Sequence, residues 1–136
     1  MTATDIVFPR LQVEEGFRAL PYKDSKGLTT VGYGFCVDRG ITKRCAAALL
    51  REEIAEAHDT LSTYPWYKGL DPARQSVCLD IAINDGLHGL LGFVSMIHFL
   101  TLQNWEQAAV ECHVSNPELA SRYQTLAQVL RTGVTS

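Results

Sequence analysis

The sequence lacks the cysteine pattern of a zinc or redox site. Its four cysteines are Cys36, Cys45, Cys78 and Cys112. No two of them form a C-x-x-C pair, the spacing with which many structural zinc sites begin. We therefore expect no metal and no other cofactor, and we expect reduced, buried thiols, as in chains made in a reducing cytoplasm. The alternative is a helical metal or redox protein built on these cysteines.

The sequence also lacks an excess of positive charge. Its formal net charge is −3 and its pI is about 5.7. Domains that bind nucleic acid usually carry a basic patch, so we expect no nucleic-acid partner. The opening residues, MTATDIVFPRLQVEE, do not show the basic and then apolar order of a secretion signal. We therefore expect synthesis in the cytoplasm without a signal peptide.

Residues 86–103 contain no Asp, Glu, Lys or Arg, which raises the question of a membrane span. Three glycines, two histidines and several other polar residues in this stretch favour a buried core helix and the turn before it. We therefore expect no membrane insertion. The chain has 136 residues and shows no internal repeat or low-complexity tract, so it is predicted to form a single domain.

The most informative segment is EEGFRALPYKDSKGLTTVGYGF, which begins at Glu14. The residues before it have the apolar spacing of a helix, and Gly16 is placed to end that helix in a left-handed conformation. Pro9 is then expected in the first turn, where its missing N–H is not needed. Glu15 is expected in the last turn of the helix.

The rest of this segment predicts a β-hairpin. Its loop is Ser25, Lys26 and Gly27, with Gly27 in the left-handed conformation. Asp24 then faces Leu28, and Tyr22 faces Thr30. Because side chains alternate along a strand, Asp24 and Thr30 project from one face as diagonal neighbours, with room for one water between them.

Two carboxyl groups and a water-holding hydroxyl are the components of a glycosidase. Glu15 would be the acid that protonates the leaving oxygen, and it would need an apolar wall beside it to keep its proton near neutral pH. Asp24, in a wetter place, would stay ionised and activate the water with the help of Thr30.

The same segment resembles the signature of the phage-type lysozymes and endolysins, glycoside hydrolase family 24. The resemblance rests on Leu11, Glu15–Arg18, Tyr22–Asp24, Gly27 and Thr29–Gly34, and it extends to Gly86–Phe93, Trp105–Ala109 and Leu130–Gly133. It implies a mostly helical α+β fold over residues 1–136. A small β-hairpin lobe at about 17–42 and a larger helical lobe at about 43–136, which includes the N-terminal helix, would flank a cleft.

By this resemblance, Glu15, Asp24 and Thr30 fall on the catalytic acid, the second carboxylate and the water-holding threonine. Arg122 matches an arginine that lies near the acid, or else it is a surface residue. Tyr22 and Asn84 line the sugar cleft, or else they are a packed hairpin tyrosine and a core amide. The implied reaction is hydrolysis, with inversion, of the β-1,4 bond between N-acetylmuramic acid and N-acetylglucosamine.

The resemblance also implies a biological setting. The protein would be a monomeric phage or prophage enzyme, made in the cytoplasm of the bacterial host and acting on the glycan strand of periplasmic or cell-wall peptidoglycan. It would reach the wall through a holin pore or on a virion, and it would cause cytolysis as an antimicrobial hydrolase. Two alternatives are a virion-associated lysozyme-like module that binds glycan without cutting it, and a transglycosylase that forms anhydro-sugar ends.

The remaining sequence predicts a helical bundle. Thr42, Asp71, Asn104 and Asn116 are expected to cap helices. The run VCLDIAI, apolar nearly all round, is typical of a central helix. The side chains expected to face inward are Leu50, Ile54, Ala57 and Leu61 on one helix and Leu119, Tyr123, Leu126 and Leu130 on the last one.

Overall fold

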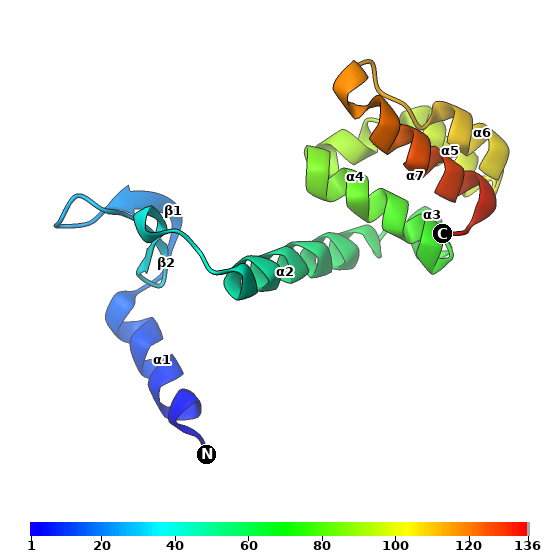
Figure 1. Ribbon diagram of the computed structural model, residues 1–136. Coiled ribbons are helices and arrows are strands. Elements are labelled where there is room, and N and C mark those ends of the chain that lie inside the picture. Colours follow the sequence, from blue (N-terminus) through cyan, green and yellow to red (C-terminus); the bar gives the residue numbers. More distant parts are fainter. Residues whose placement is uncertain (136) are drawn as a thin grey trace. The chain divides into compact units, whose positions relative to one another are not determined.

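The computed structural model describes residues 1–135. Along these residues the chain forms seven α-helices and a three-stranded antiparallel sheet, and 67% of it is helical. The predicted mostly helical α+β class is confirmed. The chain falls into two compact units, Met1–Ala48 and Leu49–Ser136, and α2 (Lys43–Leu61) contributes to both. Figure 1 shows the elements of each unit.

The first unit opens with helix α1 (Ala3–Glu15). Its N-terminus is a capping box: the Asp5 N–H donates to the Thr2 hydroxyl at 3.2 Å, and the Thr2 N–H donates to the Asp5 carboxylate at 2.8 Å. These bonds lower the pKa of Asp5, the one to the Thr2 backbone most of all. Gly16 ends the helix with φ 68° and ψ 155°, so φ is positive as predicted but ψ is extended.

The predicted position of Pro9 is wrong, because Pro9 lies inside α1 and not in its first turn. The capping box at Thr2 starts the helix earlier than the apolar spacing indicated. The helix therefore continues through the proline, which lacks an N–H to donate. Within the first unit, no residue of α1 is buried.

The sheet follows α1 and has the strand order β1-β2-β3. Its strands are β1 (Arg18–Lys23), β2 (Thr29–Gly32) and β3 (Phe35–Cys36), and a 3-10 turn, η1 (Val37–Arg39), comes next. Tyr22 pairs with Thr30 and Lys23 pairs with Thr29. This is the predicted register, and it places the hairpin loop at residues 25–27. The register shifts between Arg18 and Tyr22.

The second unit is a helical bundle around one apolar core. Besides α2 it contains α3 (Pro65–Lys68), α4 (Pro72–Leu91), α5 (Val94–Thr101), α6 (Trp105–Glu111), a 3-10 turn η2 (Pro117–Leu119) and α7 (Ala120–Thr132). Helices α5, α6 and α7 pack side by side, and α7 also contacts α4 (Figure 1). The largest fully buried side chains are those of Leu61, Tyr67, Val77, Cys78, Ile81, Leu90, Met96, Leu100 and Leu130.

Most of the predicted helix ends are confirmed. Thr42, Asp71 and Asn104 each accept a backbone N–H three residues ahead, at 3.2 Å in every case. Asn116 caps η2 and not α7, because a 3-10 turn precedes that helix. The predicted inward faces are partly confirmed. Tyr123, Leu126 and Leu130 of α7 are buried. Of the four α2 residues expected to face inward, Leu61 is buried and the other three are not.

The uncharged stretch 86–103 is not one helix. Gly86 has φ 79° inside α4, and α4 and α5 are bent by 93° to each other. In the described part of the chain no single helix has the length and apolar character to cross a membrane, although this bent pair meets the test of length and composition. Met96 and Leu100 of α5 are buried in the core, as expected for a core helix.

Arg74, in the first turn of α4, holds the C-terminal end of α7. Its Nε donates to the Leu130 carbonyl at 2.7 Å and its Nη2 donates to the Arg131 carbonyl at 3.4 Å, which satisfies carbonyls at the C-terminus of α7. Its Nη1 donates to Asp71 at 2.9 Å, and its guanidinium lies 4.0 Å from the centre of the Trp105 ring. The side chain is only 11% exposed, so these contacts are weakly screened by solvent.

Replacing Arg74 should therefore destabilise the second unit. We expect Arg74→Ala to lower the free energy of unfolding by about 2 kcal/mol, because the part-buried Leu130 carbonyl and Asp71 carboxylate lose their donor. Arg131→Ala is the matched control. It breaks a pair with Glu106 whose side chains are 37% and 63% exposed, and it should cost under about 1 kcal/mol. Urea unfolding followed by the fluorescence of Trp66 and Trp105 would measure both.

The four cysteines differ in burial. Cys78 and Cys112 are buried, Cys36 is half-buried and Cys45 is exposed, and none is in a disulfide. Burial raises the pKa of the Cys78 and Cys112 thiols to about 12. Both thiols therefore stay protonated near neutral pH.

This difference predicts selective thiol chemistry. At pH 8 we expect a thiol reagent to modify Cys45 within minutes and to leave Cys78 and Cys112 unmodified until the protein is denatured, because the thiolate is the reactive form. Mass spectrometry of peptides after timed labelling would measure this. Rapid labelling of Cys78 in the folded protein would contradict it.

Candidate functional site

The first component of the site is the carboxylate of Asp24, at the end of β1. Its Oδ1 accepts the N–H of Lys26 at 2.8 Å and the N–H of Leu28 at 2.9 Å. Gly27, with φ 78°, donates its N–H to the Asp24 carbonyl at 3.0 Å and completes the loop. In the first unit no described residue donates to Oδ2. One carboxylate oxygen therefore shapes the loop, and the other is available to a water or a substrate.

The second component is Thr30, on β2. It is 5% exposed, and it is the buried residue of the first unit. Its hydroxyl donates to the Leu28 carbonyl at 3.3 Å, so its oxygen can still accept a hydrogen bond. Asp24 pairs with Leu28 and Tyr22 pairs with Thr30, so alternation along the strands puts Asp24 and Thr30 on one face.

Tyr22 belongs to the same face. It lies opposite Thr30, it is half-buried, and the guanidinium of Arg18 lies 4.2 Å from the centre of its ring. This contact is a cation–π interaction within β1. The hairpin thus brings together three of the six site residues predicted from the sequence.

The third component is Glu15, at the C-terminus of α1, and its surroundings differ from the expectation. The side chain is exposed, and in the first unit it forms no hydrogen bond or ion pair with a described residue. The expected apolar wall is therefore absent from this unit. The reason is that this unit has no apolar core at the helix end: Phe17, the nearest aromatic residue along the chain, is itself 63% exposed.

Glu15 instead lies against the backbone of Gly34, in the turn between β2 and β3. A Cβ placed on Gly34 would be 2.6 Å from Glu15 Oε2. Gly34 is part of the sequence segment that resembles the family signature, but the signature did not predict its contact with Glu15. The signal that could have found it is the pair of glycines around Tyr33, since a close backbone approach is one reason to place a glycine in a turn.

The remaining two predicted residues, Asn84 and Arg122, lie in the second unit. Arg122 donates to Asp80 Oδ1 from Nη2 at 2.6 Å and from Nε at 3.0 Å, and its Nη1 donates to Asn84 Oδ1 at 3.3 Å. Asp80 is the polar residue of the otherwise apolar run VCLDIAI. Its spacing of four from Asn84, which puts both on one helix face, could have indicated this cluster. A pair between Arg122 and Glu15 stays a prediction.

The Asn84 amide also bears on a buried tyrosine. Burial raises the pKa of Tyr123, and a hydrogen bond with Asn84 opposes that rise. Asn84 is exposed within the second unit, so it is not the core amide that was the alternative to a sugar-lining residue.

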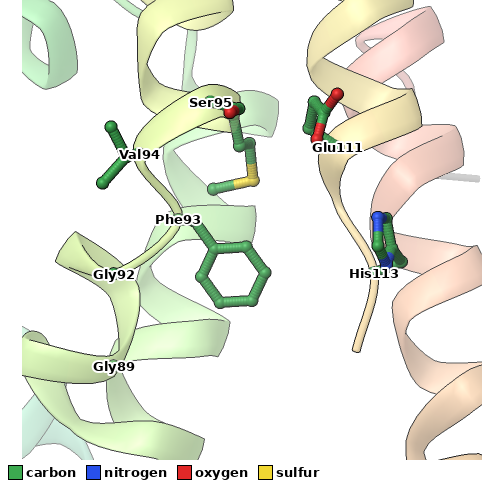
Figure 2. A pocket seen from close by; sticks show the side chains of 8 residues that line it. Gly89, Gly92, Phe93, Val94, Ser95, Glu111 and His113 are labelled. Atoms are coloured by element: carbon green, nitrogen blue, oxygen red, sulfur yellow. The ribbon is translucent and has the colours of Figure 1, made fainter. Parts of the chain in front are cut away.

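A pocket of about 430 Å³ opens elsewhere in the second unit, near the start of α5. Figure 2 shows the Phe93 ring pointing into it and Glu111 and His113 on the opposite wall. Among the described residues no three His, Cys, Asp or Glu side chains are placed to hold a metal ion.

A comparison with known protein families gives one match. The model of the Phage lysozyme family matches residues 12–127, which is more than half of the chain. The chain belongs to the phage lysozyme family. The match confirms the family predicted from the sequence, and it makes the protein a glycosidase that degrades peptidoglycan in the bacterial cell wall.

The loop of this lysozyme yields a structural prediction about Asp24. Asp24→Asn keeps an Oδ1 acceptor for the Lys26 and Leu28 N–H groups, whereas Asp24→Ala removes it. Hydrogen exchange at those two amides should stay slow in Asp24→Asn and rise about fivefold or more in Asp24→Ala, since each lost bond contributes about 1 kcal/mol. Two-dimensional NMR would measure the rates. Equal rates in the two variants would contradict the role of Oδ1.

Proposed function

We propose that this lysozyme hydrolyses the β-1,4 bond between N-acetylmuramic acid and N-acetylglucosamine, and that Glu15, Asp24 and Thr30 carry the reaction. The observation that supports the proposal is the hairpin register. It puts a carboxylate with one unused oxygen and a hydroxyl with acceptor capacity on the same face of the sheet. A water held between them is oriented by two acceptors and can attack a sugar carbon.

In the proposed reaction, Glu15 donates its proton to the glycosidic oxygen as the bond to the anomeric carbon breaks. The water held by Asp24 and Thr30 attacks the same carbon from the opposite face, and Asp24 accepts a proton from it. One water is consumed, and two sugar ends are formed. Because the attacking group is a water and not the carboxylate, the configuration at the anomeric carbon inverts.

The exposure of Glu15 adds a requirement to this mechanism. A general acid works best when it holds its proton near the working pH, and removal of water favours the neutral carboxyl. Since the first unit by itself leaves Glu15 exposed, we propose that the bound glycan strand excludes water from it. Binding of the glycan would thus favour the protonated form of Glu15. Short substrates, which exclude less water, would be cut more slowly than long ones.

The biological role that fits this activity is lysis of the host by a phage. The enzyme would act as a monomer on the cell wall after synthesis in the host cytoplasm, with a holin pore or a virion for access. A virion-associated module that binds glycan without cutting it is the second candidate. It is favoured by the exposed Glu15, and the cleavage test below separates the two.

The decisive experiment is digestion of purified peptidoglycan followed by mass spectrometry. We expect fragments that have gained one water, whereas a transglycosylase would release anhydro-sugar ends. Glu15→Gln and Asp24→Asn should each lower the rate by about 100-fold or more, as is typical when a general acid or base is removed. Thr30→Val should lower it as well, and Thr30→Ser should keep part of it.

Glu14→Gln is the matched control, because Glu14 is the exposed neighbour of Glu15 on the same helix. Its rate should equal that of the parent enzyme. Circular dichroism would establish that each variant is folded. Near-normal cleavage by Glu15→Gln would remove the acid from the mechanism, and binding of glycan without any cleavage by the parent protein would favour the non-catalytic module.

A further inference from the structure

The Glu15 carboxyl makes a close contact that involves no hydrogen bond. In the first unit the carboxyl has no hydrogen-bond or ion-pair partner among the described residues, and its end lies on the backbone of Gly34. A Cβ on Gly34 would meet Oε2 at 2.6 Å, Cδ at 3.0 Å and Cγ at 3.4 Å. The hydrogen of Gly34 thus occupies a space in which no other side chain could stand without moving the carboxyl.

The backbone of Gly34 is held near α1 by its neighbour Tyr33. The Tyr33 hydroxyl accepts a hydrogen bond from Gln12 Nε2 at 3.2 Å, and the rings of Tyr33 and Phe17 are 5.5 Å apart. Gln12 and Phe17 flank Glu15 on the chain. The turn is therefore tied to both sides of the residue that Gly34 touches, and an added side chain at position 34 would displace the carboxyl more readily than the turn.

Gly32, two residues away, shows that the turn alone does not explain this contact. It has φ 68°, close to the φ of 75° at Gly34, so both positions favour glycine for the same conformational reason. A Cβ on Gly32 would have no atom within 4 Å. An alanine at either position would therefore have similar backbone strain. Only an alanine at position 34 would clash with another side chain.

We infer that Gly34 is a positioning residue for the acid: its bare Cα sets the place of the Glu15 carboxyl. The inference rests on the proposed function of Glu15. It adds a residue to the site that acts through Glu15 and not on the substrate. A carboxyl displaced by about 1 Å from the scissile oxygen is expected to lose about 100-fold in rate, because proton transfer needs close alignment.

The test compares Gly34→Ala with Gly32→Ala on soluble peptidoglycan fragments. Both variants introduce alanine at a positive φ, so both should lose similar thermal stability. Gly34→Ala should lower kcat by about 100-fold with little change in KM, since the acid and not the binding surface is disturbed. Gly32→Ala should keep kcat within a few-fold of the parent enzyme.

A double variant supplies a readout that a purely structural role would not move. Glu15→Asp shortens the acid by one methylene and withdraws it from position 34. Its loss of kcat should therefore not add to that of Gly34→Ala, and the double variant should be about as active as Glu15→Asp alone. Full additivity would contradict the contact.

If Gly34→Ala does not fold, NMR of Glu15→Asp still tests the inference. The Gly34 Hα signals should shift and those of Gly32 should not, and unchanged Gly34 signals would overturn it. The two proposals fail in different ways. Equal activity of the parent enzyme and Glu15→Gln would overturn the proposed function, whereas an inactive Glu15→Gln together with a Gly34→Ala variant as active as Gly32→Ala would overturn the positioning role alone.

Discussion

The site depends on one carboxylate oxygen that closes a hairpin loop. Asp24 Oδ1 accepts two backbone N–H groups, from Lys26 and Leu28, and so fixes where β1 ends and β2 begins. The two pairs next to the loop, Lys23 with Thr29 and Tyr22 with Thr30, follow from that point. A shift by one residue there would turn Thr30 to the other face. In Asp24, Oδ1 therefore holds the loop, and Oδ2 is available to bind a water or a substrate.

In the first unit, burial in an apolar core contributes little to the positions of the site residues. Thr30 is its buried residue, and the apolar side chains of α1 are exposed. Its geometry comes from backbone pairing, from the capping box of α1 and from the contacts of Tyr33. A small unit of this kind can hold a carboxyl by direct contact with a glycine, where a larger one would surround it with apolar side chains.

The second unit works in the opposite way. Its core is apolar, and the polar groups within it are individually satisfied: the Tyr67 hydroxyl reaches His58 Nδ1 at 2.7 Å, and Arg74 satisfies carbonyls at the end of α7. Its exposed cluster of Asp80, Asn84 and Arg122 gains less per contact, because solvent screens it. The two units thus rely on different interactions, backbone geometry in one and burial in the other.

Local rules were enough to predict the hairpin, because its loop, pairing and alternation involve residues close along the chain. Gly27, Asp24 and the alternation of Tyr22 and Thr30 are all read from a dozen residues. The same rules misplaced Pro9, since a cap at Thr2 overrode the apolar spacing. Only the tertiary structure decided that Glu15 is exposed within the first unit and rests on Gly34, and that Arg122 pairs with Asp80. These contacts join segments separated along the chain, and no periodicity encodes them.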